Sequence, residues 1–65
     1  MSKFNEGIDA ALKQLKSTAE DYEQMAQRLG NLQHRSDREQ RELQELQSKA
    51  QLLRGQMMHI DKLKQ

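Results

Sequence analysis

The spacing of the apolar residues is the feature that most limits the possible folds of this 65-residue chain. From Phe4 to Lys64, alternating steps of four and three residues pass through eighteen positions, of which fourteen are apolar. This is the a/d pattern of a coiled coil, and the two-residue period of a β-strand cannot produce it. Gln, Glu, Lys, Arg, Ala and Leu dominate the rest of the chain, and all are good helix formers. The sequence therefore predicts an all-α fold.

Ten of the apolar positions are predicted to form a helix–helix seam. They are Ile8, Leu15, Tyr22, Met25, Leu29, Leu43, Leu46, Leu53, Met57 and Ile60. In the first half of the chain, Leu12, Ala19 and Ala26 add a flank to this seam. The apolar surface is then wider than a two-stranded coiled coil requires, and such width suits a helix that has two or more neighbours.

A helix stop and a helix start lie in the middle of the chain, where the seam is interrupted at Ser36 and Glu39. Gly30 and Asn31 can both adopt the left-handed conformation that ends many helices. Ser36 and Glu39 have the spacing of a capping box, in which the Ser is the N-cap and the Glu reaches back to it. The sequence predicts a single module over residues 1–65.

The predicted module is an antiparallel, coiled-coil-like helical hairpin. Its first helix covers about residues 3–29, its turn residues 30–36 and its second helix about residues 37–63. The alternative is one continuous coiled-coil helix, about 97 Å long at 1.5 Å per residue. The unchanged register of the seam on both sides of Ser36 favours that alternative, whereas the stop and start signals favour the hairpin.

Small size and composition indicate that the hairpin needs a partner. Only 34% of the residues are apolar, and the chain has two aromatic residues and no Cys. Without disulfides or thiolate metal sites, a scaffold of this size usually gains stability through association. We expect a helical bundle formed with other copies of the chain or with another helical protein. On the second helix, Leu52, Met58 and Leu63 lie off the main stripe and form a candidate partner surface.

The sequence argues against catalysis and metal binding. A catalytic pair needs a dry cleft, which two thin helices do not offer. His34 and His59 are 25 residues apart, and neither has a second His or Cys three or four residues away; Asp61 is the only nearby ligand candidate for His59. We expect no enzyme activity, no cofactor and no metal.

Nucleic-acid and membrane binding are also disfavoured. A nucleic-acid-binding bundle would use five cations, namely Arg35, Arg38, Arg41, Lys49 and Arg54, but acidic residues alternate with them along the second helix. The acidic residues of the first helix oppose binding to anionic lipid. No apolar stretch approaches the length of a membrane span, and the start of the chain lacks the apolar region of a signal peptide. We expect a soluble, cytoplasmic protein without a cleaved leader.

The length of the chain, its helix–Gly-turn–helix plan and the segment from Leu46 to Leu53, followed by Met57-Met58-His59-Ile60, resemble the small hairpin co-chaperones of type III secretion needle subunits. The resemblance covers the second half of this chain. Those proteins hold an aggregation-prone needle subunit together with a second chaperone. The resemblance implies a chaperone contact at Leu53, Met57 and Ile60. The main functional prediction is a non-enzymatic protein–protein interaction module that binds helices through the seam. The alternative is a small co-chaperone that masks an amphipathic helix of a secretion or phage-assembly protein.

Overall fold

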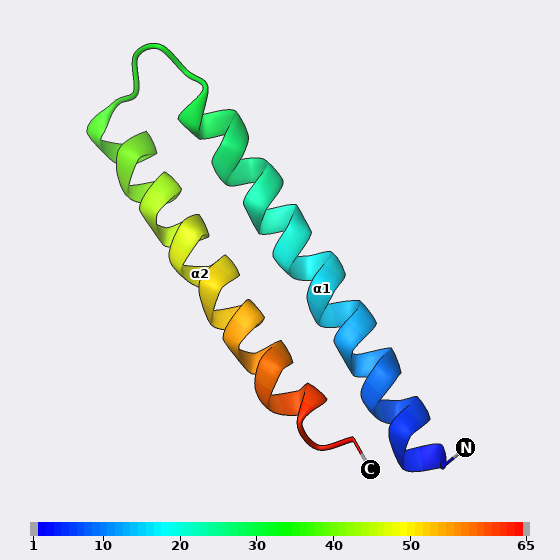
Figure 1. Ribbon diagram of the computed structural model, residues 1–65. Helices are drawn as coiled ribbons and strands as arrows, with labels where there is room; N and C mark the ends of the chain where they lie inside the picture. Colours follow the sequence, from blue (N-terminus) through cyan, green and yellow to red (C-terminus); the bar gives the residue numbers. More distant parts are fainter. Residues whose placement is uncertain (1, 65) are drawn as a thin grey trace.

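Two antiparallel helices make up the described part of the chain (Figure 1). The computed structural model describes residues 2–64, in which α1 covers Lys3–Gly30, α2 covers Asp37–Asp61 and no strand is present. The helices lie side by side, with the turn at one end and both chain ends at the other. The predicted hairpin is confirmed, and the alternative of one continuous helix is wrong.

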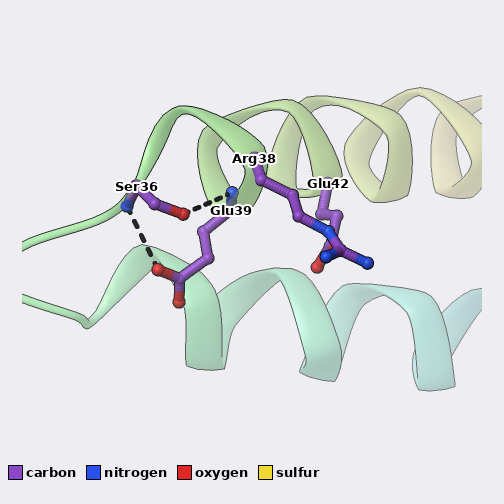
Figure 2. A network of polar contacts seen from close by, with 4 residues as sticks. All are labelled: Ser36, Arg38, Glu39 and Glu42. Atoms are coloured by element: carbon purple, nitrogen blue, oxygen red, sulfur yellow. Dashed lines mark hydrogen bonds and ion pairs between the residues drawn. The ribbon is translucent and has the colours of Figure 1, made fainter.

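Both helices begin where a serine can cap them. The Ser2 side chain accepts a hydrogen bond from the Asn5 backbone N–H at 3.1 Å, at the start of α1. Figure 2 shows the capping box at the start of α2, where Ser36 Oγ accepts from the Glu39 N–H and Glu39 Oε1 accepts from the Ser36 N–H, both at 3.1 Å. The two bonds satisfy N–H groups that a helix start otherwise leaves unpaired. The capping box predicted from the sequence is therefore confirmed.

The end of α1 lies at the predicted glycine, but the reason predicted for it is wrong. No residue in the described range 2–64 has a positive φ, and Asn31, the C-cap, has φ −85° and ψ −8°. The Arg35 guanidinium supplies the stop instead, since its Nη1 donates to the carbonyl oxygens of Gly30 at 3.0 Å and Leu29 at 3.3 Å. A cation there also interacts favourably with the negative end of the helix dipole.

The end of α2 lies two residues before the predicted one. The helix stops at Asp61, with Lys62 as its C-cap, and the following turn is closed by a hydrogen bond from the Leu63 N–H to the Ile60 carbonyl at 3.0 Å. Leu63 was predicted to be the last helical residue and lies instead in this turn. Within residues 2–64, neither helix has an apolar stretch long enough to cross a membrane.

The contact between α1 and α2 is narrow and consists mainly of small residues. Four apolar residues of the described chain are buried: Ala19 and Ala26 on α1, and Leu43 and Ala50 on α2. In each helix the two residues are seven positions apart, so they form one stripe along the helix. Alanine side chains let two helices approach closely, but they bury little apolar area. The hairpin therefore has a thin core of its own.

Candidate functional site

The two sides of α1 differ in chemistry, and Ala19 marks the boundary between them. Ala19 is 0% exposed, so it points directly at α2. Successive residues of an α-helix are about 100° apart, which places Tyr22 about 60° to one side of this direction and Glu23 about 40° to the other. The apolar and polar flanks of α1 therefore lie on opposite sides of the contact.

The same geometry divides α2 at Ala50, which is 4% exposed and points at α1. Leu53 is turned by about 60° to one side of this direction, and Lys49 lies on that side too, whereas Arg54 is turned by about 40° to the other side. Each helix thus has one flank with large apolar residues, although on α2 this flank also carries Lys49 and Glu42, and the Arg54 flank also carries Met58.

Two contacts between the helices show which flanks lie on the same side of the hairpin. Arg54 forms a two-point ion pair with Glu23, with Nη2–Oε1 and Nε–Oε2 distances of 2.7 and 3.3 Å. The Lys49 Nζ lies 5.9 Å from the centroid of the Tyr22 ring. The first contact joins the two polar flanks, and the second joins the two apolar flanks. Large apolar residues from both helices therefore share one side of the molecule.

We call this side the open apolar face. It consists of Phe4, Ala11, Leu15, Tyr22, Met25 and Leu29 from α1, and of Leu46, Leu53 and Ile60 from α2. Seven of these nine residues are half-buried, and Phe4 and Met25 are exposed. Among the described residues, each helix has only one neighbouring helix. The side chains of the face are therefore shielded on the side toward that neighbour and exposed on the other side. The face runs along both helices and has no covering element within residues 2–64.

The opposite side of the hairpin carries the charges that join the helices. Hydrogen bonding to Arg54 lowers the pKa of the Glu23 carboxyl from 4.5, and the same bond raises the pKa of Arg54. A shallow groove on this side is lined by the apolar residues Leu12, Met57 and Met58 and by the charged residues Lys13, Lys16, Arg54 and Asp61. These charged residues and the ion pair make this side more polar than the open apolar face.

The structure separates the ten predicted seam residues into two groups. Leu43 and Met57 lie in the α1–α2 contact, where Leu43 is buried and Met57 half-buried, and half-buried Ile8 lies close to the same direction on α1. The other seven lie on the open apolar face: Leu15, Tyr22, Met25, Leu29, Leu46, Leu53 and Ile60. Met25 is the clearest departure, because it is 43% exposed. It is six residues beyond Ala19, which turns its side chain about 120° away from α2.

The three residues of the candidate partner surface are all exposed but do not form one patch. Leu52, Met58 and Leu63 are 64%, 65% and 56% exposed. Leu52 and Met58 are six residues apart on α2, so their side chains point about 120° apart. Met58 lines the groove on the polar side, and Leu63 lies in the turn after α2.

Sequence reasoning missed two features that shape the site. The sequence pattern places Ala19 and Ala26 on a flank of the seam, yet they form the centre of the α1 contact. The signal was their seven-residue spacing, which continues back to Leu12. Arg35 was considered only as a possible phosphate ligand, whereas it caps α1 and also donates from Nε to Gln40 Oε1 at 2.8 Å. A cation close behind a helix end was the available signal.

Most of the cations considered for nucleic-acid binding contact other groups of the chain. Arg35 donates to backbone carbonyls, Arg38 pairs with Glu42 at 3.4 Å (Figure 2), Arg54 pairs with Glu23, and Lys49 lies over Tyr22. In the described part of the chain, no three His, Cys, Asp or Glu side chains lie close enough together to hold a metal ion.

Comparison with protein-family models, with curated protein sequences and with solved structures finds no match to this chain.

Proposed function

We propose that this chain is a non-enzymatic protein–protein interaction module that binds helices through the open apolar face. The observation that supports this best is the mismatch between its two apolar surfaces. The contact inside the hairpin buries three alanines and one leucine, whereas the larger residues, among them Leu15, Tyr22 and Leu53, lie beside it and remain partly exposed.

The energetic reason is the area of these side chains. Burial of apolar surface contributes about 25 cal/mol per Å², so alanines contribute little and the leucines, isoleucine and tyrosine could contribute much more. A ligand for this face must itself be long, apolar along one side and regular, because the face follows two helices. Another helix, or a pair of helices, has that shape and packs by placing its ridges in the grooves between side chains.

We propose that the chain acts by assembling with other helices. We also propose that it does so in the cytoplasm, because a chain without Cys suits a reducing compartment. The partner is another copy of the chain or a different helical protein. A co-chaperone that masks an amphipathic helix would use the same face, so the identity of the bound helix distinguishes these cases.

Site-specific photocrosslinking in the native source tests the proposal. A benzophenone amino acid is placed at position 22, on the open apolar face, and in a second variant at position 27, an exposed position on the other side of the same helix. We expect crosslinks from position 22 to a helical segment, identified by mass spectrometry of the joined peptides, and few or none from position 27. Equal crosslinking from both positions, or none from position 22, would contradict the proposal.

A further inference from the structure

We infer that the helical partner of the open apolar face is a second copy of this chain, and that two hairpins close a four-helix bundle. This inference rests on the proposed function and adds the identity of the partner. The argument comes from the exposed area, from the number and length of the helices, and from the charges around the face.

The hairpin exposes more surface than a compact chain of its mass. Its accessible surface is 5415 Å². A compact monomer of 7.6 kDa would expose about 4,300 Å². The excess is about 1,100 Å², whereas each partner in a standard protein interface buries about 600–1,000 Å². One protein–protein interface of standard size per chain would therefore reduce the exposed area to about that of a compact protein of this mass.

The shape of the face fits a partner that supplies two helices. The hairpin measures 51 × 14 × 12 Å, so it is one helix thick, and its open apolar face spans both α1 and α2. A single added helix would lie along the groove between α1 and α2 and leave the outer apolar residues, such as Met25, uncovered. A second hairpin supplies two helices of matching length, and four helices are enough to enclose a core.

The charges are compatible with self-association. The net charge is +1, so two copies repel each other only weakly. Lys49 has its Nζ over the Tyr22 ring, and the residue is exposed, so the ammonium group can also contact water. On α2, Glu42 and Arg38 lie on the same flank as Leu53, but they pair with each other at 3.4 Å and are exposed, so their head groups can remain in water. A dimer with twofold symmetry uses the same surface on both chains, and the apolar residues of the face can pack against their own copies.

Two adjacent leucines provide a matched pair of variants for the test. Leu53 lies on the open apolar face, and Leu52 is 64% exposed on the outer side of α2. Leu53→Gln and Leu52→Gln make the same chemical change one residue apart. Analytical ultracentrifugation and circular dichroism of the full chain are recorded from micromolar to millimolar concentration.

We expect the wild-type chain to sediment with the mass of two copies, twice 7.6 kDa, and to lose helix content as it dissociates on dilution. Leu53→Gln should raise the dimer dissociation constant at least tenfold, with helix content recovered at higher concentration. Leu52→Gln should change it less than threefold. A wild-type mass of one copy or of more than two copies throughout, or equal weakening by both variants, would overturn the inference.

The outcome is separable from that of the crosslinking experiment. If position 22 crosslinks to a different helical protein while the purified chain stays monomeric, the face is a binding site but its partner is not a second copy. If position 22 crosslinks to nothing, both proposals fail.

Discussion

At the scale of single residues, the size of the side chain at the helix contact decides how the hairpin divides its apolar surface. Ala19 and Ala50 point at each other's helix and are almost completely buried, so the space between the helices at these positions is filled by methyl groups. The larger residues lie beside this stripe. An alanine at the centre of a contact is therefore a structural requirement here and not a neutral helix former.

Ala19→Leu should destabilise the hairpin, because three added carbon atoms do not fit between closely packed helices. The cost of such overpacking is about 1–3 kcal/mol. Ala10→Leu is the matched control, since Ala10 is exposed and nine residues away, on the opposite side of α1. Its effect should stay within about 0.5 kcal/mol. Thermal and urea unfolding at one fixed protein concentration measure both, and an equally stable Ala19→Leu variant would show that the contact has free space.

At the scale of the helices, the ends next to the turn are fixed by side chains of the turn and of the first turn of α2. Ser36 and Glu39 satisfy the first N–H groups of α2, and Arg35 satisfies carbonyl groups at the end of α1. Arg35 and Ser36 are adjacent in the sequence, so one short loop carries both the cap of α1 and the N-cap of α2. The turn is thereby specified by local chemistry.

Ser36→Ala should lower the stability of the hairpin by about 1 kcal/mol, the usual cost of removing an N-cap. The same change should affect the Glu39 carboxyl, whose pKa is lowered from 4.5 by hydrogen bonds from the backbone and side chain of Ser36. In Ser36→Ala we expect that pKa to move back toward 4.5. Carboxyl chemical shifts followed by NMR measure the pKa, and an unchanged value would argue that the Ser36 hydroxyl does not contribute to it.

The sign of the pH dependence follows from the direction of this shift. When the pH falls below 4.5, the Glu39 carboxylate of the unfolded chain binds a proton more readily than that of the folded chain does. The contribution of the carboxylate to stability is therefore complete above pH 4.5 and is lost as the pH falls through the lower folded-state pKa. Glu39→Gln keeps an acceptor for the Ser36 N–H but does not titrate, so its stability should depend less on pH in this acidic range.

At the scale of the whole molecule, the ion pair of Glu23 with Arg54 joins α1 and α2 in their observed alignment. Exchanging the two residues tests this directly. Glu23→Arg alone places two cations together, and Arg54→Glu alone places two carboxylates together, so both should lower the melting temperature. The double variant restores opposite charges and should recover much of the loss. The recovery should shrink in 1 M salt, because exposed charges are screened there. Additive single effects would mean that the pair does not couple the helices.

The sequence was sufficient to predict the all-helical hairpin, because the heptad spacing and the Ser36/Glu39 capping box are local signals. It was not sufficient to predict which part of the wide apolar surface of α1 would contact α2. A seam through Leu15 and Tyr22 and a seam through Ala19 and Ala26 both satisfy the same periodicity. The choice depends on packing between helices that are distant in the sequence, as does the ion pair between Glu23 and Arg54, which are 31 residues apart.

The position of the two chain ends has a mechanical consequence. Both lie at the end of the hairpin opposite the turn (Figure 1). A tension applied between them would load the helix contact one layer at a time, starting at the pair formed by Asp9 and Lys64 and reaching the turn last. A tension applied between the turn and one end would instead run along the backbone of a single helix, so the contact between the helices would carry little of it. The contact is therefore weakest against a force that draws the two ends of the hairpin apart.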